Sequence, residues 1–148
     1  MKMSGILVGV DGSEQSRQAL KWAVAEAGTW HVPLRVLTVH QIVAGYSGGG
    51  VMYPGDHALI EDTRKAAQRE TDQVLDAIDE ESRPPAVTVA AVGGLPGEEL
   101  LHAAEDADMV VVGARGAGGF KRLLVGSVAS QLAYHAHCPV VIVPSGER

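Results

Sequence analysis

The chain of 148 residues is 46% hydrophobic and 20% charged, a composition typical of one globular domain with room for a buried core. Its formal net charge of −6 disfavours general nucleic-acid binding, which needs a basic face, and its single cysteine, Cys138, excludes an internal disulfide framework. No apolar run approaches the roughly 18 residues of a membrane span, and the N-terminal apolar stretch is too short for a signal peptide, so we expect a single cytoplasmic domain over residues 1–148.

Apolar runs and amphipathic stretches alternate along the chain. A run of consecutive apolar residues predicts a strand, and apolar residues at helical spacing predict a helix. In chain order, we expect a strand at 6–10, a helix at 13–27, a strand at 34–39, a helix at 57–81, a strand at 87–92, a helix at 97–107, a strand at 109–112, a helix at 127–137 and a strand at 140–143. Such alternation favours a parallel sheet with helices on both faces and right-handed crossovers.

The first two predicted helices carry further signals. The helix at 57–81 has one inward apolar face, made of Ile60, Ala67, Val74 and Ile78. Asp11 or Ser13 can cap the first helix, because their side-chain oxygens accept hydrogen bonds from its unpaired N–H groups. Trp22 and Trp30 are expected to pack between helices rather than stack on bases, since an isolated tryptophan seldom makes a platform.

The residues that follow the strands mark the expected ligand site. In open α/β sheets, ligands bind beyond the carboxyl ends of the strands, and here Asp11, Val39 and Gly113 stand at those ends. Gly126 and Ser127 begin the last helix, whose N–H groups form an anion site that a ligand can approach closely because glycine has no Cβ. This arrangement predicts a phosphate cradle, with a flexible surface turn as the plainer alternative.

These motifs resemble the universal stress protein family. The likeness covers essentially the whole chain, and its quoted parts are Val-Asp-Gly-Ser at 10–13, Gly-x-Pro at 94–96, Gly113-x-x-Gly116-x₉-Gly126-Ser127 and Cys-Pro-Val-Val-Ile-Val-Pro at 138–144. The resemblance implies an α/β fold of the adenine nucleotide alpha hydrolase-like type, an open five-stranded parallel sheet in the order 3-2-1-4-5. It also implies ATP binding, because the ATP-binding branch of the family keeps this glycine pattern.

The resemblance also implies a role for each residue of the nucleotide site. Asp11 would contact the ribose or a phosphate-bound Mg²⁺, and Val39 would hydrogen-bond the adenine edge through its backbone. The phosphates would be surrounded by Gly113, Arg115, Gly116, Gly126, Ser127 and Val128. Elementary chemistry agrees, because a carboxylate can hold hydrated Mg²⁺ and Arg115 can neutralise phosphate charge. Capping of the first helix alone is an alternative role for Asp11.

Other nucleotide and catalytic motifs are absent or misplaced. The chain has no Walker A loop and no G-x-G-x-x-G after its first strand. Gly45-x-Ser47-x-Gly49 has the spacing of a nucleophile elbow, but that elbow must join a strand directly to a helix, and here it lies inside a glycine-rich loop. The six histidines show no ligand spacing. We therefore predict no catalytic residue and no metal centre made by the protein alone.

The leading functional hypothesis is an ATP-binding protein that acts as a stress-response sensor or regulator through nucleotide-dependent protein interactions. One alternative is a slow ATPase or a phosphoryl- or nucleotidyl-transfer enzyme that uses Mg²⁺ on Asp11. Another is a dimeric interaction module whose cleft is empty in the cell. We also expect a homodimer. The topology that the resemblance implies places the apolar, uncharged strand at 140–143 at a sheet edge, which invites pairing with a second copy; cover of this edge by residues 145–148 is the plainer alternative.

Overall fold

The computed structural model describes residues 4–42, 55–115 and 126–144. Strands and helices alternate along these residues, as expected. The elements are β1 (Ile6–Val10), α1 (Glu14–Trp30), β2 (Leu34–Gln41), α2 (Asp56–Asp76), the 3₁₀ turn η1 (Glu80–Ser82), β3 (Val87–Gly94), α3 (Pro96–Ala104), β4 (Met109–Gly113), α4 (Ser127–His135) and β5 (Val140–Val143).

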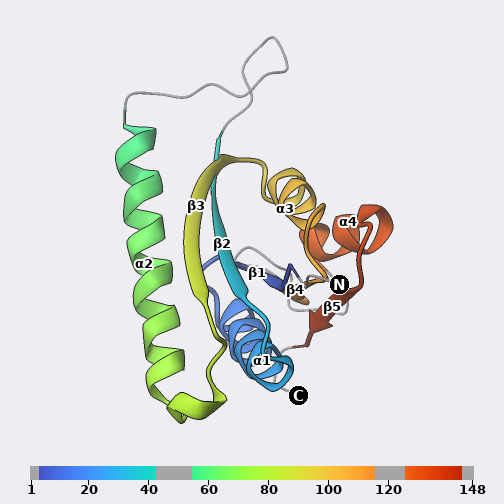
Figure 1. Ribbon diagram of the computed structural model, residues 1–148. Helices are drawn as coiled ribbons and strands as arrows, with labels where there is room; N and C mark the ends of the chain where they lie inside the picture. Colours follow the sequence, from blue (N-terminus) through green and yellow to red (C-terminus); the bar gives the residue numbers. More distant parts are fainter. Residues whose placement is uncertain (1–3, 43–54, 116–125, 145–148) are drawn as a thin grey trace, which may run out of the picture.

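The five strands form one parallel sheet in the order β3-β2-β1-β4-β5 (Figure 1). This order and the alternating helices confirm the predicted fold class. The chain runs outward from β1 to β2 and β3, then crosses back to β4 on the other side of β1 and continues to β5. The strand order therefore reverses between β1 and β4, which is the point where open α/β sheets bind ligands.

The sheet separates two hydrophobic cores. On one face, α1 and α2 pack over β1 and β2, and this core contains Ile6 and Val8. On the other face, α3 and α4 pack over β1, β2 and β4, and this core contains Leu7. Every residue of β1 is buried, because the strand lies in the middle of a sheet that is covered on both faces. The near-continuous apolar runs of the sequence have this physical origin.

The second helix is shorter than predicted: α2 ends at Asp76 rather than near residue 81, and η1 follows it. The reason is tertiary packing. Arg83 donates from Nε to the Leu75 carbonyl at 3.0 Å and so satisfies one of the last carbonyls of α2. The chain of η1 then turns back onto α1, where Gly28 lies so close that a Cβ there would be 2.0 Å from the Ser82 carbonyl oxygen.

The prediction for Trp30 was wrong. Its side chain is 61% exposed at the end of α1, where Nε1 donates to Glu26 at 2.6 Å. Trp22 packs against the core under α1 and α2, as expected. Helix α1 continues through Gly28 to Trp30, beyond the predicted end at residue 27, and it stops at His31, whose backbone is left-handed (φ 52°).

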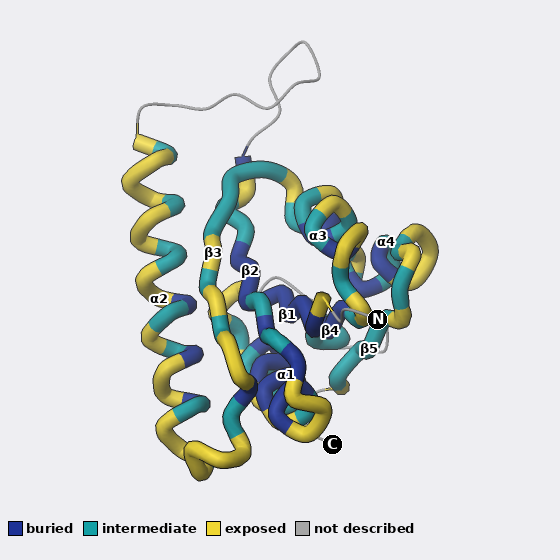
Figure 2. Tube along the Cα trace, viewed as in Figure 1, coloured by how far each residue is buried: buried dark blue, intermediate teal, exposed yellow. Residues whose placement is uncertain are grey.

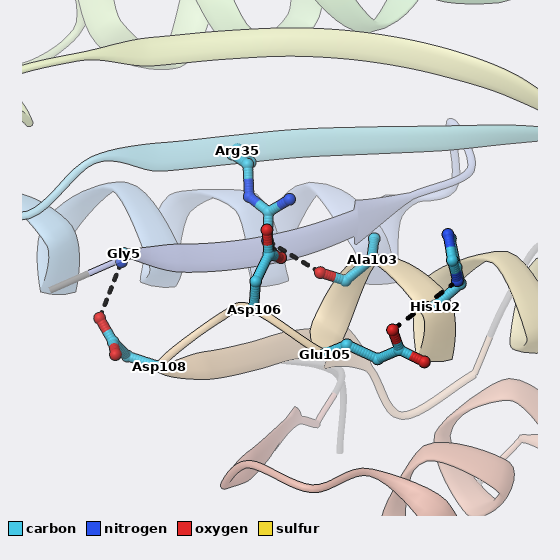
Figure 3. A network of polar contacts seen from close by, with 7 residues as sticks. All are labelled: Gly5, Arg35, His102, Ala103, Glu105, Asp106 and Asp108. Atoms are coloured by element: carbon cyan, nitrogen blue, oxygen red, sulfur yellow. Dashed lines mark hydrogen bonds and ion pairs between the residues drawn. The ribbon is translucent and has the colours of Figure 1, made fainter.

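Polar groups close the amino ends of the strands (Figure 3). Asp108, just before β4, accepts at Oδ2 from the Gly5 N–H at 2.8 Å and donates its own N–H to the Gly5 carbonyl at 2.9 Å. Arg35 of β2 donates from Nη2 to the Ala103 carbonyl at 2.8 Å and to Asp106 at 2.9 Å. Arg35 thus satisfies a carbonyl at the end of α3 and ties that helix to the sheet.

Candidate functional site

The carboxyl edge of the sheet has a step at β1. The β1–β2 pairing ends at Val10 opposite Thr38, whereas the β2–β3 pairing continues to Gln41. Asp11 and Val39 are the residues immediately beyond the last β1–β2 pair. The backbone edge of Val39 that faces β1 therefore lies past the end of that strand. The Val39 side chain packs on the face of the sheet that α3 and α4 cover.

A set of hydrogen bonds fixes Asp11 in the turn from β1 to α1. Its Oδ1 accepts from the Ser13 N–H at 2.9 Å and from the Ser13 hydroxyl, and its own N–H donates to the Ser16 hydroxyl at 3.2 Å. Ser13 is the N-cap of α1, since its Oγ accepts from the Ser16 N–H at 3.2 Å. Gly12 between them has φ of +83°. Asp11 is exposed and is held in place by the residues that cap the helix.

Gly113, at the end of β4, lies against the first turn of α1. A Cβ at this position would be 3.0 Å from the Gln15 carbonyl group, which is closer than ordinary contact. Extending the β1–β4 register, in which Val8 pairs with Val111, places Gly113 beside Val10. The structure thus brings Gly113 near Asp11 and gives the missing Cβ a packing reason, the close approach of α1 to β4.

The first turn of α4 is anchored through backbone groups. Gly126, its N-cap, has an extended backbone (φ −62°, ψ 167°) and donates its N–H to the Ala114 carbonyl. Ala114 in turn donates its N–H to the Val143 carbonyl at 2.9 Å. No side chain of the described residues caps this helix. The start of α4 therefore lies beside the carboxyl end of β4, and no described side chain gives its first N–H groups the acceptor that Ser13 supplies to α1.

The other expected phosphate contacts fall into three groups. Ser127 is exposed at the start of α4, while the Val128 side chain packs into the core under α3 and α4, so only its backbone can face a ligand. Arg115 is partly buried two residues after β4 and has a polar partner. Gly116 lies outside the described residues, as does the Gly45–Gly49 segment that was weighed as a nucleophile elbow.

A cavity of about 350 Å³ opens between α2 and the carboxyl ends of β1 and β2, and we call it the α2 cleft. Buried residues of α2 occur only in its second half (Figure 2). The α2 residues that line the cleft lie between Leu59 and Glu70. The cleft is lined by Val10, Asp11, Gly12, Thr38, His40, Leu59, Asp62, Thr63, Ala66, Ala67 and Glu70. Of the predicted site residues, only Asp11 belongs to this lining.

Glu70 is a residue of the cleft lining that has a buried oxygen without a hydrogen-bond donor among the described residues. Its Oε1 is buried and has no hydrogen-bond partner in the part of the chain that the structure describes. Burial raises the pKa of this carboxyl; Arg17 opposes the shift, and the charges of Asp11 and Glu14 add to it. Sequence reasoning missed Glu70, yet a signal existed, because a charge three residues after Ala67 and four before Val74 lies on the inward face of the helix.

His40, which lines the cleft, contacts the first residue of α2. Its Nε2 lies 2.9 Å from Oδ1 of Asp56, the first residue of α2, and both side chains are largely buried. The contact joins the end of β2 to the start of α2. Strand periodicity could have indicated this position, because Thr38 and His40 continue the face of β2 that begins with the buried Leu34 and Val36.

Metal and membrane features were searched over the described residues. In these three ranges, no group of three or more His, Cys, Asp or Glu side chains could hold a metal ion. None of the helices placed by the structure is both long and apolar enough to cross a membrane. A metal at Asp11 would therefore need most of its ligands from a bound molecule and from water.

Sequence comparison links the chain to known proteins. The model of the Universal stress protein family matches residues 3–144. Universal stress protein Rv2028c of Mycobacterium tuberculosis is 36% identical over 145 residues, which cover 96% of this chain and 48% of that protein. Universal stress protein YxiE of Bacillus subtilis is 31% identical over 144 residues, covering 93% of this chain and 97% of that protein. The chain thus spans about half the length of some relatives and nearly all of another.

Solved structures share the fold. Universal stress protein UspA from Lactobacillus plantarum aligns with a TM-score of 0.75 at 23% identity, over 97% of this chain and 99% of that one. A universal stress protein in complex with cAMP aligns with a TM-score of 0.65 at 23% identity, over 97% and 98% of the two chains. The universal stress protein of Archaeoglobus fulgidus in complex with dAMP aligns with a TM-score of 0.62 at 24% identity, over 97% and 99%.

Proposed function

Because the chain belongs to the universal stress protein family, we propose that it binds an adenine nucleotide, ATP, across the carboxyl ends of β1, β2 and β4. The observation that carries the proposal is the start of α4, where Gly126 is anchored to Ala114 and no described side chain caps the helix. Such a helix start favours an anionic group. Two family members with this fold are complexes with cAMP and dAMP.

The nucleotide would lie across β1, with its phosphates at α4 and its nucleoside on the β2 side. Ser127 and the backbone N–H groups of the first turn of α4 would bind phosphate oxygens, and Arg115 and Gly116 would complete the cradle. Val39 would offer backbone groups to the adenine edge beyond the end of β1. Gly113 would keep α1 close enough to β4 for one ligand to reach both sides.

Mg²⁺ suits this site only together with the nucleotide. Asp11 is the carboxylate at the sheet edge, and its Oδ1 is engaged by Ser13. Bound Mg²⁺ would neutralise phosphate charge and would take its remaining ligands from phosphate oxygens and water. Asp11 would hold the hydrated ion in place, or else accept a hydrogen bond from a ribose hydroxyl, and the two roles differ in their dependence on the metal.

We assign the protein the role of a cytoplasmic sensor or regulator in a stress response, with nucleotide occupancy read out through protein contacts. This role rests on the family and on the absence of a general base from the sequence motifs, so repeated turnover of ATP would instead support the enzymatic alternative. ATP versus another adenine nucleotide can be decided by mass spectrometry of the small molecules released when the purified protein is denatured.

A homodimer through β5 is part of the proposal. In the described residues β5 pairs only with β4, and its four apolar residues are all partly exposed. A second copy could pair antiparallel with this edge and cover it. Light scattering should show dimers at micromolar concentration, and Ile142→Lys should convert them towards monomers or aggregates. A stable wild-type monomer at high concentration would contradict edge pairing.

The cradle is tested by Gly126→Val. The extended backbone of Gly126 is accessible to valine, so the variant should fold, but the branched side chain would occupy space that the phosphates need. We expect titration calorimetry to show at least a hundredfold loss of ATP affinity, about 2.7 kcal/mol. A folded variant with wild-type affinity would refute the phosphate cradle.

A further inference from the structure

The α2 cleft is chemically unlike a phosphate site. Three carboxylates line it, from Asp11, Asp62 and Glu70, and its described lining contains no lysine or arginine. Such a lining repels phosphate and favours an uncharged group that donates hydrogen bonds. In a nucleotide that lies across β1, the part that reaches this side is the nucleoside.

The walls of the cleft favour the base over the ribose. Val10, Leu59, Ala66 and Ala67 give it apolar sides, and its volume of about 350 Å³ is at the small end of ligand pockets, which span roughly 300–1,000 Å³. A purine base has two flat apolar faces and a polar edge, which fits a small pocket with apolar walls and few polar groups. A ribose presents hydroxyls around its ring and would leave several of them against these walls.

One polar atom of the lining lacks a partner. The buried Oε1 of Glu70 has no hydrogen bond within the described ranges, and a buried acceptor without a donor costs free energy that a ligand can recover. An N–H of a bound base would supply the missing donor. Adenine carries its N–H donors on the exocyclic amine, and a 6-oxo purine has an acceptor in that place.

We propose that the α2 cleft receives the adenine base and that Glu70 accepts a hydrogen bond from its exocyclic amine. Glu70 is then the residue that distinguishes adenine from 6-oxo purines. The inference rests on the proposed nucleotide function and deepens it. It is compatible with the Val39 contact, because Val39 lies between the lining residues Thr38 and His40 and can bind a different edge of the base through its backbone.

The test compares ATP with inosine triphosphate, which differs at the exocyclic group. Calorimetry should show that wild-type protein prefers ATP by about tenfold. Glu70→Leu should lose this preference because it has no acceptor. Glu70→Gln should lose it too, since an amide can turn to donate to the 6-oxo group. Asp72→Asn is the matched control on the same helix: its carboxylate is exposed and does not line the cleft, so the preference should be unchanged.

The possible outcomes distinguish the assignment of the base to the α2 cleft from the proposed binding of a nucleotide. If wild-type protein binds ATP but both folded Glu70 variants keep its purine preference, the base assignment is overturned and the proposed function stands. If the Glu70 variants weaken ATP and inosine triphosphate equally, and 2′-deoxy analogues escape that loss, Glu70 contacts the ribose and the assignment is likewise wrong. If wild-type protein binds no purine nucleotide at millimolar concentration, the proposed function itself fails.

Discussion

The two ends of the sheet treat their polar groups in opposite ways. At the amino ends, Asp108 exchanges two hydrogen bonds with Gly5, and Arg35 satisfies the end of α3 (Figure 3). At the carboxyl ends, the start of α4 has no described side-chain cap and Glu70 keeps a buried oxygen without a donor. Polar groups that have their hydrogen-bond partners add to stability. Buried polar groups without a partner cost stability, but they can bind a ligand.

The largest effect that this comparison predicts is at the amino end, in Gly5→Ala. Gly5 has φ of +99°, and a Cβ there would lie 2.2 Å from the Pro33 carbonyl oxygen. We expect the free energy of unfolding in urea to fall by about 3 kcal/mol, from backbone strain and steric clash together. ATP affinity of the folded protein should not change.

Gly12→Ala is the matched control at the carboxyl end. Gly12 has a similar φ of +83°, but nothing lies within 4 Å of its would-be Cβ. Strain alone should cost about 1 kcal/mol. Equal losses in the two variants would show that the close packing of Gly5 is not what distinguishes them.

An intermediate effect is expected at Asp11, on binding rather than on folding. Asp11→Asn keeps an oxygen that can accept from Ser13, so unfolding free energy should change by less than about 0.5 kcal/mol. If the carboxylate acts through Mg²⁺, affinity for Mg-ATP should fall about tenfold, and affinity for ATP in the presence of a chelator should fall less. Equal losses with and without Mg²⁺ would assign Asp11 to the ribose or to the turn alone.

The smallest effect is expected for Glu70→Gln, which should raise the free energy of unfolding, whereas the two glycine substitutions lower it. A raised pKa means that folded Glu70 holds its proton above the ordinary value of 4.5, so stability declines as pH rises from there through the folded pKa. Glu70→Gln removes this cost. Because Glu70 is only partly buried and solvent screens its charge, the unfolding free energy of the variant should exceed that of wild type by a few tenths of a kcal/mol (about 0.5 at most) at neutral pH, and the gain should vanish below pH 4.5. A gain that persists in acid would have another cause.

The sequence predicted the fold well because the strands are buried on both faces. The bounds of β1 and β5 match the prediction. Asp11 ends the apolar run of β1, and Pro139 and Pro144 flank the apolar run of β5. The early end of α2 was not predictable, because it depends on the approach of η1 to Gly28 of α1, which are distant in sequence. Trp30 shows the same limit: helical spacing cannot tell which turn of a helix extends past its neighbours.

Two of the residues that the sequence analysis names for the site are placed close together by the fold, and both stand at the ends of strands. Asp11 follows β1 and Gly113 ends β4, and the structure brings them together around the first turn of α1. Glu70 belongs to a helix whose inward side has two roles: Ala67, Thr71 and Val74 are buried, while a row of residues from Leu59 to Glu70 lines a cavity. Where a helix separates from the sheet is a property of the assembled layers, and no local pattern marks it.

The backbone path from Val143 through Ala114 to Gly126 has a thermodynamic consequence. Two hydrogen bonds connect the end of the edge strand β5 to the first turn of α4, without using a side chain. No side-chain substitution along the path, other than one to proline, deletes these bonds directly. Linked equilibria are reciprocal, so any factor by which a bound nucleotide tightens pairing at β5 is also the factor by which pairing raises nucleotide affinity. If the coupling is favourable, a higher concentration of either the protein or the nucleotide would then shift the equilibrium towards the nucleotide-bound dimer.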